Sequence, residues 1–439
     1  MTAETTRRHF IRNTTEAAAL GATLSTLGGV HAFAADSGPV RVALIGCGGI
    51  MNLHAQGFAE KRRTASVTWL CDVDPQQVDT IAKHLPSPGP RRTARYEDVL
   101  EDGDVDAVVI ATPHQWHAPI AIRAMQAGKD VYCEKPISHV YDEGPLMIRA
   151  AEKYGRIVQQ GSQMRSSPVT AEAERLLADG ILGEIKIAKA WTAEMRNVVR
   201  PLPDSQPPNR VNYDRWLGPA RARPFNTHRF HRTWRMFTDY GNGEIGDDGI
   251  HDLDMACWGL GVTTVPSQVT ARGSRSYLHG HASDYPDNMV VSYDYADGKL
   301  LIYENYPFTS YGLHGFDNGN VFYGTEGYMV FSRRGAFSVF LGPKNKPGPT
   351  ESKNIRSSRG YGEHMDNFLQ AVRTRQSPRS SPQVAHNSCA LVHLGEIAYR
   401  TRGRLDFDPQ RDRFVNCPEA DELLTKQYRA PYGLPEVGV

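Results

Sequence analysis

The sequence predicts an α/β protein with two domains, a parallel sheet near the N-terminus and a large, mostly antiparallel open sheet in the C-terminal part. Short apolar strands alternate with helical stretches over residues 40–160, as a parallel sheet covered by helices requires. Longer alternating strands follow at residues 185–195, 268–277 and 288–306, the pattern of an antiparallel sheet with one buried face. The 439 residues are enough for two domains, each with its own core.

The first strand of the parallel sheet, Val40–Ile45, leads directly into a glycine-rich turn and then into a helical stretch. Gly46 permits a tight turn, and Gly48 lets the backbone approach a pyrophosphate. Gly49 and Ile50 lie at the helix N-terminus, where free N–H groups and a partial positive charge favour an anion. This order of strand, turn and helix predicts a dinucleotide-binding Rossmann domain.

The second strand, residues 66–71, ends at Asp72. Its carboxylate is placed to accept both ribose hydroxyls of an adenosine, and it would repel a 2′-phosphate. Asp74 adds negative charge, so we predict NAD as the cofactor and regard NADP as less favoured. Met51 occupies the place of the third glycine of the usual pattern, so Asp72 and the flanking strand and helix carry the prediction.

Two further strands of this sheet end in residues that can carry chemistry. Residues 105–112 lead into Pro113, and Asp130–Cys133 lead into Glu134 and Lys135. The carboxyl ends of strands are where doubly wound sheets bind ligands. A lysine beside a nicotinamide ring can hydrogen-bond a substrate hydroxyl and help to move its proton. The alternative is an ordinary solvated lysine at the end of a strand.

A second group of candidate residues lies at 247–251. Asp247 and His251 are four residues apart, so they share one face if a helix begins there. A carboxylate and an imidazole on one face can orient each other and take the proton of an alcohol. Asp248 is a further candidate for substrate contact. No metal is predicted, because only two ligands are apparent, and the structural alternative is an acidic helix N-terminus with a packed histidine.

Residues 225–237, just before this group, are dense in aromatic and basic side chains. Aromatic faces pack on the C–H surfaces of sugars, and histidine and arginine can hydrogen-bond hydroxyl groups. We therefore name His228, His231 and Trp234 as candidate substrate contacts. The alternative is a packed loop with surface arginines.

The first 35 residues resemble a twin-arginine (Tat) export signal. Arg7 and Arg8 precede a mildly apolar segment at residues 17–30, and the small residues at 32–34 suit signal peptidase. This predicts export by the Tat route to the periplasm. The alternative is a disordered basic tail.

The composition argues against several classes of partner. Lys plus Arg, 50 residues, nearly equal Asp plus Glu, 49 residues, so no excess of charge favours nucleic acid. No apolar run after the N-terminus is long enough to span a bilayer. The six cysteines are scattered without a CxxC pair, which makes a zinc or redox site a poor interpretation.

Several short motifs together resemble the Gfo/Idh/MocA family of sugar oxidoreductases. They are Gly46-Cys-Gly48, Ala111-Thr-Pro113 followed by His117, Gly128-Lys-Asp-Val131, Glu134-Lys135-Pro136 and Asp247-x-Gly249-x-His251. The resemblance covers nearly the whole chain after the signal, and residues 414–432 are similar to a branch with exported members. It implies that Lys135 is the catalytic lysine, with Asp247 and His251 as its partners at the substrate.

The same resemblance carries over to the cofactor site and the domains. It implies that Glu134 touches the nicotinamide ribose and that Thr112, Pro113 and His117 line the cofactor. It also implies that the open sheet of the second domain forms the face of a homodimer or homotetramer. The predicted divisions of the chain are the signal at 1–35, the NAD-binding Rossmann domain at 36–162, and a substrate-binding and oligomerisation domain with a C-terminal extension at 163–439.

The function predicted from these residues and this resemblance is that of an exported NAD-dependent oxidoreductase acting on a secondary hydroxyl of a sugar, glycoside or cyclitol. Because the compartment outside the cytoplasm supplies no NAD, we expect a tightly held cofactor that is restored within the catalytic cycle. Two alternatives stay open: a redox-neutral, NAD-dependent glycoside hydrolase, and a non-catalytic protein that binds sugar or NAD.

Overall fold

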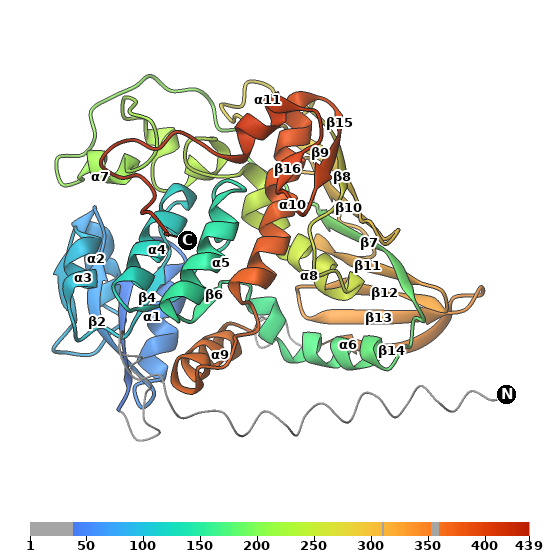
Figure 1. Ribbon diagram of the computed structural model, residues 1–439, viewed down its shortest axis with the longest axis horizontal. Helices are drawn as coiled ribbons and strands as arrows, with labels where there is room; N and C mark the ends of the chain where they lie inside the picture. The colour runs from blue at the N-terminus through green and yellow to red at the C-terminus, as the bar shows by residue number, and fades with distance from the viewer. Residues whose placement is uncertain (1–37, 310, 353–359, 439) are drawn as a thin grey trace. The chain divides into compact units, whose positions relative to one another are not determined.

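The computed structural model describes residues 38–309, 311–352 and 360–438, so the predicted signal at residues 1–35 lies outside the described residues. The N-terminal sheet has six strands in the order β3-β2-β1-β4-β5-β6, all paired in parallel (Figure 1). Its strands are β1 (Val40–Ile45), β2 (Ala65–Cys71), β3 (Arg91–Thr93), β4 (Ala107–Ile110), β5 (Asp130–Cys133) and β6 (Val158–Gln160).

Helices cover both faces of this sheet, which confirms the predicted doubly wound α/β fold. Val42 and Leu44 of β1 pack in one core with Met51, whereas Ala43 packs in the opposite core with Ile120. A strand buried on both faces needs a continuous apolar run, and β1 provides one. The helices that connect the strands are α1 (Met51–Glu60), α2 (Pro75–Ala82), α3 (Tyr96–Glu101), α4 (His117–Gln126) and α5 (Glu143–Tyr154).

The strand order reverses between β1 and β4, which are neighbours in the sheet. Gly46, directly after β1, has a φ of +86°, and a Cβ there would lie 2.7 Å from backbone atoms of Ala111 and Thr112. Only glycine tolerates both the dihedral angle and the contact. Open α/β sheets bind their ligands at such a switch point.

The second sheet has ten strands in the order β14-β13-β12-β11-β7-β10-β9-β8-β15-β16. Its pairs are antiparallel except for β7 with β10, so the mostly antiparallel prediction is confirmed. The strands are β7 (Ile185–Thr192), β8 (Gln268–Ser274), β9 (Asn288–Asp294), β10 (Leu300–Asn305), β11 (Asn318–Gly324), β12 (Gly327–Ser332), β13 (Ala336–Leu341), β14 (Lys346–Ser352), β15 (Arg404–Asp408) and β16 (Arg413–Phe414).

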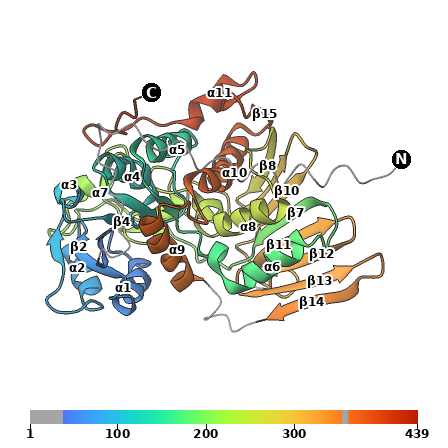
Figure 2. The same ribbon diagram turned by 60° about the horizontal axis from the view of Figure 1, so that its bottom comes forward.

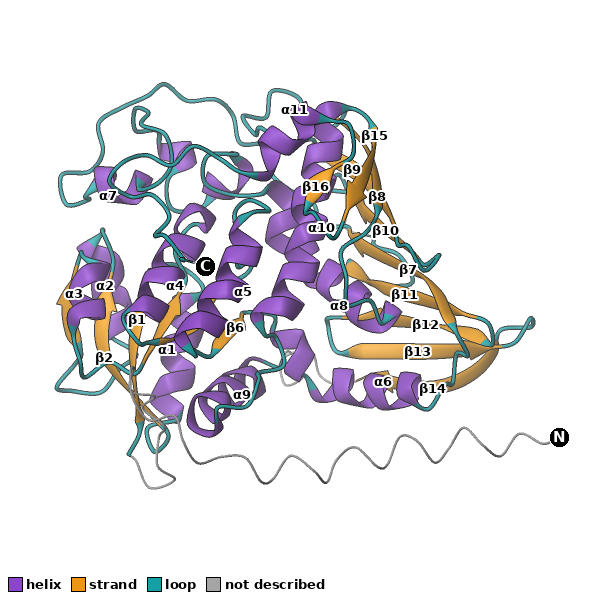
Figure 3. Cartoon of the chain, in the orientation of Figure 1, coloured by secondary structure: helices purple, strands orange, loops and turns teal. Residues whose placement is uncertain are grey.

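One face of this large sheet packs on α8 (Ile250–Leu260) and α10 (Pro382–Thr401), which lie between the two groups of strands (Figure 3). Buried side chains such as Leu301 and Phe322 make this core. The other helices of this part are α6 (Pro168–Ala178), α7 (Tyr213–Leu217), α9 (Tyr361–Thr374) and α11 (Pro418–Asp421). No helix in the described part of the chain combines the length and apolar character that crossing a bilayer requires.

One segment expected to be a loop contains a strand. The Gly, Pro, Ser and Lys content of residues 342–359 predicts an exposed loop, but β14 pairs there with β13. β14 is the edge strand of the sheet, where prolines such as Pro347 and Pro349 are tolerated because one side of the strand needs no partner.

Helix α9 lies in the sequence between β14 and β15 of the second sheet but packs on the first (Figure 2). Met365 and Phe368 of α9 belong to the same core as β1 and α1. Lys61, just after α1, and Asp366 form an ion pair at 2.6 Å. A helix from late in the chain therefore covers part of the N-terminal sheet. The predicted boundary after residue 162 assigns this helix to the second domain instead.

Candidate active site

A cavity of about 400 Å³ lies at the carboxyl ends of β1, β2, β4 and β5, where they face α8 and the segment before it. This volume is typical of a small-molecule site. Every predicted site residue except His228 lines it. These lining residues are Gly46, Gly48, Gly49, Ile50, Asp72, Thr112, Pro113, His117, Glu134, Lys135, His231, Trp234, Asp247, Asp248 and His251.

The glycine-rich turn leaves room for a ligand. A Cβ added at Gly48 or Gly49 would meet no atom within 4 Å. The backbone N–H groups of Gly48, Gly49 and Ile50 have no acceptor among the described residues, and α1 has no side-chain cap. The N-terminus of α1 can therefore receive an anion. Met51, in place of the third glycine, is buried in the core beside the sheet.

Asp72 lies after β2, and two backbone donors fix its carboxylate. The N–H groups of Cys47 and Asp74 donate to its two oxygens at 2.7 and 2.8 Å. Burial raises the pKa of Asp72 to about 6, and these hydrogen bonds oppose the rise. Asp72 is therefore ionised at neutral pH and can accept hydrogen bonds from ribose hydroxyls.

Asp74 has a structural role at the Asp72 end of the cavity. Its carboxylate caps α2 through the N–H of Gln76 and binds Arg210 at 2.9 Å and His231 at 3.1 Å. His231 therefore lies where the adenosine half of a dinucleotide would bind, away from the reacting end. Its assignment as a substrate contact stays a prediction.

His228 does not line the cavity, so its assignment as a substrate contact is corrected. It lies in a short 3-10 turn, where its backbone N–H donates to the side chain of Asn226, and its Nδ1 is buried without a partner in the described part of the chain. The aromatic density of this segment builds a hydrophobic cluster of its own. Its buried members include Trp216, Phe225, Phe230, Trp234, Phe237 and Tyr240.

His117 contacts the segments that follow β4 and β5. Its Nδ1 and Nε2 lie 2.7 and 2.8 Å from the carbonyl oxygens of Pro136 and Thr112. Burial lowers the pKa of His117, and the two carbonyls oppose this effect. The hydroxyl of Thr112 is buried without a hydrogen-bond partner among the described residues, so it is a group that a ligand could satisfy.

Glu134 is held by a histidine from α1. Nε2 of His54 lies 2.8 Å from its Oε1. Burial raises the pKa of Glu134, but His54 outweighs this effect and holds the pKa below its ordinary value. A Cβ at Gly161 would lie 2.9 Å from the carboxyl group, so Gly161 makes room for Glu134. The result is an ionised carboxylate at the cavity wall.

Lys135 reaches across the cavity to Asp247. Its ammonium donates to the backbone carbonyl of Asp247 and, at 3.0 Å, to Oδ1, and Arg235 donates to the same oxygen at 2.9 Å. Burial raises the pKa of Asp247, but Lys135 and Arg235 outweigh it and hold the pKa below its ordinary value. Asp247 therefore orients Lys135.

His251 lines the cavity from the first turn of α8. A π-helical turn, Ile245–Gly249, precedes α8. The predicted pairing of Asp247 with His251 assumed α-helical spacing between them, and the π-helical turn changes that spacing. No hydrogen bond joins these two side chains among the described residues, so that expectation is corrected. Burial, with the cations Lys135 and Arg333, lowers the pKa of His251 well below its ordinary value. The ring is neutral, so its unprotonated nitrogen can accept a hydrogen bond from a hydroxyl group.

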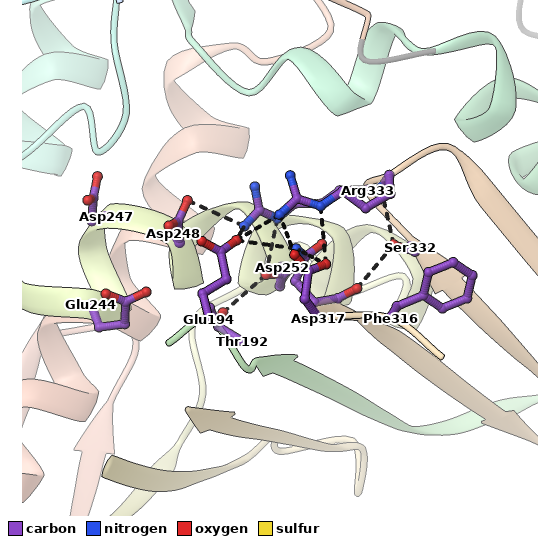
Figure 4. Close-up of polar contacts among 12 residues, drawn as sticks. Thr192, Glu194, Glu244, Asp247, Asp248, Asp252, Phe316, Asp317, Ser332 and Arg333 are labelled. Atoms are coloured by element: carbon purple, nitrogen blue, oxygen red, sulfur yellow. Dashed lines mark hydrogen bonds and ion pairs between the residues drawn. The ribbon is translucent and has the colours of Figure 1, made fainter. Parts of the chain in front are cut away.

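Figure 4 shows an ionic network around Arg333, of which Glu194, Asp248 and Arg333 itself line the cavity. Nη2 of Arg333 lies 3.3 Å from both Glu194 and Asp248, and its Nε lies 3.5 Å from Asp252. Burial raises the pKa of Asp252 to about 8, while Arg333 opposes the rise. Asp248 also binds Arg196. Its carboxylate is therefore paired with two arginines, Arg196 and Arg333, and a substrate that binds Asp248 would also lie close to them.

Several lining residues escape prediction from the sequence. They are His114, Glu194, Arg235, Arg333 and Arg334. Arg235 lies in the aromatic and basic segment, whose composition is its only signal. Its guanidinium lies 4.3 Å from the centroid of the Trp234 ring, which packs edge-on against His114. Arg333 and Arg334 follow β12, far along the chain, and no motif marks them.

These residues fit a bound dinucleotide. The open space over Gly48 and Gly49 and the free N–H groups suit a pyrophosphate. The ionised Asp72 suits an adenosine ribose, and Glu134 with the unsatisfied Thr112 hydroxyl suits the other half. Lys135 and His251 lie at the end where a reacting substrate would meet the cofactor.

Family comparison defines the class. A model described as an oxidoreductase family with an NAD-binding Rossmann fold matches residues 40–162, and one for the C-terminal alpha/beta domain of an oxidoreductase family matches residues 184–325 and 344–434. Fold and site are thus those of a two-domain, NAD-binding oxidoreductase. The chain belongs to the Gfo/Idh/MocA oxidoreductase family.

Individual relatives are distant. The chain is 26% identical over 369 residues to an inositol 2-dehydrogenase of Rhizobium meliloti, which covers 82% of this chain and 96% of the relative. It is 28% identical over 153 residues to a glycosyl hydrolase family 109 protein of Shewanella pealeana, 33% of each chain. A structure of levoglucosan dehydrogenase with NADH and levoglucosan matches with a TM-score of 0.66 and 20% identity, over 84% of this chain and 99% of that one.

Proposed function

We propose that this protein is an NAD-dependent oxidoreductase that acts on a secondary hydroxyl group of a neutral sugar, glycoside or cyclitol. One observation carries the proposal. Lys135, which follows β5 of the first sheet, and His251, in α8 against the second sheet, line the same cavity as the glycine-rich turn. The inositol and levoglucosan dehydrogenases among its relatives support a polyhydroxylated substrate. Asp72 supports NAD over NADP.

The charges at the reacting end favour a neutral substrate. Lys135 pairs with Asp247, and Arg333 and Arg334 both pair with Glu194. These cations already have carboxylate partners, so a substrate phosphate or carboxylate would have to compete for them. Hydroxyl groups both donate and accept hydrogen bonds, which suits a wall of alternating cations and carboxylates.

Lys135 and His251 have different roles at the reacting hydroxyl group. The Lys135 ammonium, oriented by Asp247, donates a hydrogen bond to the substrate oxygen. The neutral ring of His251 accepts the hydroxyl proton while the alcohol becomes a ketone. Bound NAD⁺ supplies the acceptor for the hydride that leaves the carbon atom.

The contacts at the Asp72 end support a tightly held cofactor. We call residues 205–240 the covering segment, because it contacts this end of the cavity from between β7 and α8. Arg210 pairs with Asp74 at 2.9 Å, and the N–H of Asn212 donates to the carbonyl of Val73 at 3.1 Å. A cofactor bound beneath these contacts would need them to open before it could leave.

The C-terminal tail fastens the covering segment. Arg429 and Tyr432 both bind the carboxylate of Asp214, at 2.6 and 2.7 Å. Nη2 of Arg123 on α4 in turn donates to the carbonyl of Gly433 at 2.7 Å. The tail therefore links the covering segment to the first sheet's helices. This arrangement supports the retained cofactor that export would require.

Export and recycling complete the proposal. The Tat-like segment at residues 1–35 would send the folded protein to the periplasm with its cofactor already bound. There, a second sugar carbonyl would take back the hydride and restore the cofactor. We also propose that a second copy of the chain covers the outward face of the ten-stranded sheet.

Mass spectrometry of the small molecules released on denaturing the purified protein tests the proposal. We expect a pyridine nucleotide in an amount close to that of the protein, with NAD(H) in excess over NADP(H). Adding a neutral sugar should change the absorbance of the bound nicotinamide. Protein that carries no nucleotide and binds none when NAD is added would contradict the proposal.

A redox-neutral glycoside hydrolase is the second candidate, because a third of the chain is similar to a glycosyl hydrolase family 109 protein. Aryl glycosides separate the two activities. A hydrolase would release the phenol without added NAD and without net reduction of the bound nicotinamide. An oxidoreductase would leave the glycosidic bond intact and accumulate reduced nicotinamide until a carbonyl acceptor is added.

A further inference from the structure

A second cavity lies next to the first, and the proposed function does not use it. Its volume is about 320 Å³, and it lies among Arg196, Glu244, residues 275–287 between β8 and β9, and the end of β10. Nη2 of Arg196 donates to Glu244, which lines the second cavity, at 2.6 Å, and also to Asp248, which lines the first. One guanidinium group thus bridges the walls of the two cavities.

The lining of the second cavity holds buried acceptors that lack a partner. Asn305 is 3% exposed and Asp287 is 7% exposed. The side-chain oxygen of Asn305 and one carboxylate oxygen of Asp287 have no hydrogen-bond partner among the described residues. The other oxygen of Asp287 accepts the N–H groups of Tyr277 and Leu278 at 2.6 and 2.7 Å, which fixes the carboxylate. Buried acceptors left unpaired cost free energy, which a ligand hydroxyl would recover.

Donors face the same space. The side chains of Arg275 and His279 line the second cavity and make no hydrogen bond to the described residues. The two arginines of the lining, Arg196 and Arg275, are matched by two carboxyl groups, Glu244 and Asp287, and burial raises the pKa of Glu244 to about 7. A balanced lining with both donors and acceptors suits a neutral polyhydroxylated group better than an anion such as phosphate.

We propose that the second cavity is a subsite for a second sugar unit, so that the substrate is a neutral disaccharide or a longer saccharide. The proposal rests on the proposed function. One unit presents its hydroxyl to Lys135 and His251, and the next unit binds beyond Arg196 among the acceptors of the second cavity. The glycosidic link lies against Arg196, whose side chain is 30% exposed.

The test compares monosaccharides with disaccharides on the purified full chain with its cofactor. The probes are D-glucose and D-galactose and the disaccharides cellobiose, maltose and lactose, with affinity measured by saturation-transfer NMR. We expect at least one disaccharide to bind about tenfold more tightly than its component monosaccharides. His279→Trp, at an exposed lining position, should fill the second cavity and remove this gain while monosaccharide affinity stays the same. Arg272→Trp, at an exposed position that lines neither cavity, should keep the gain.

Equal affinity for monosaccharides and disaccharides would overturn the subsite, and so would a gain that survives His279→Trp, or no binding by any of the five sugars. Reduction of the bound nicotinamide, measured in the same samples, reports separately on the proposed function. If monosaccharides reduce the cofactor but disaccharides gain nothing, the subsite fails while the proposed function stands. If disaccharides bind with the gain but no sugar reduces the cofactor, the subsite stands as a binding site and the oxidoreductase fails.

Discussion

The titratable residues of the first cavity differ in charge because their neighbours differ. Asp247 is ionised because Lys135 and Arg235 outweigh its burial. Asp252, behind the cavity wall, is fully buried, one of its oxygens has no hydrogen-bond partner among the described residues, and burial raises its pKa to about 8. His251, among cations and without a hydrogen bond to the described residues, is neutral. The cavity therefore sets an anchored ammonium beside a neutral base, the combination that oxidation of an alcohol needs.

Asp72 gives the cofactor site a pH dependence. Its pKa is about 6 because of burial, and ribose hydroxyls bind its ionised form. Affinity for NAD should therefore be full above pH 6 and fall by up to about tenfold for each unit below it, as the carboxyl takes up a proton. Release of the bound nucleotide, followed by its fluorescence across pH 4 to 8, measures this. Asp72→Asn should bind weakly and without this dependence, and an unchanged pH profile in that variant would contradict the assignment.

Prediction from the sequence succeeded for residues that follow strands and failed for pairs that depend on local helix geometry. The strand ends at Asp72 and Lys135 follow from apolar runs, whose carboxyl ends meet at one edge of a parallel sheet. The pairing of Asp247 with His251 assumed an α-helical spacing, which the π-turn Ile245–Gly249 breaks. Asp247 is bound instead by Arg235 and by Lys135. Lys135 lies more than a hundred residues earlier, and no local pattern shows such a contact.

At the scale of elements, two segments from the later part of the chain complete the N-terminal domain. The covering segment reaches Asp74, and α9 packs against β1. The aromatic and basic composition of residues 225–237 does not say which sheet the covering segment contacts, and no sequence motif marks the packing of α9 on the first sheet. The strand β14 was missed for a related reason, since its position at the edge of the sheet outweighs its proline content.

Arg210→Ala tests the covering segment. Removing this side chain leaves Asp74 with only its helix cap and His231, so the contact over the Asp72 end is weakened. We expect bound NAD to dissociate several times faster. The increase in off-rate should not exceed about tenfold, because a single partly exposed ion pair contributes little free energy. Nucleotide loss during dialysis measures this. Arg221→Ala, which removes an ion pair with Asp239 in the same segment, should leave the off-rate unchanged, and equal rates in both variants would contradict the role.

Phe368→Ala tests whether α9 belongs to the first core. The ring is fully buried among residues of β1 and α1, so its removal should lower the free energy of unfolding by about 3–5 kcal/mol. Urea unfolding measures the change. Gln370→Ala, at an exposed position of the same helix, should have little effect. A loss no larger than that of the control would show that α9 does not depend on this core.

At the scale of the whole molecule, one face of the ten-stranded sheet packs on α8 and α10. The other, outward face is covered in part by Tyr306, Leu313 and Phe316 and exposed elsewhere. The strand register places Ile187, Leu300 and Tyr323 side by side on the outward face. Val290 is 44% exposed and Tyr323 is 39% exposed. Val290 lies beside Arg272 and Glu304 on this face, so the surface mixes exposed apolar side chains with charged ones. Exposed apolar side chains on a sheet surface can mark an interface between copies.

The double variant Val290→Lys and Tyr323→Lys tests this interface. Two buried lysines without partners would disfavour association, so we expect the purified protein to change from a dimer or tetramer to a monomer. Light scattering coupled to size exclusion measures the mass. Lys344→Ala, in the exposed turn between β13 and β14, is the control. A wild-type protein that is monomeric at micromolar concentration would contradict the proposed interface.

The most direct measurement of the central claim is the reduction of bound NAD in a single turnover. Purified full chain is mixed with neutral sugars, and the absorbance of reduced nicotinamide is followed. We expect Lys135→Met and His251→Ala each to slow this step by about 10²–10⁴-fold, with the bound nucleotide content unchanged, whereas Lys83→Met, outside the cavity, keeps the wild-type rate. Wild-type rates in both cavity variants would contradict the account that these two side chains act together on the substrate hydroxyl.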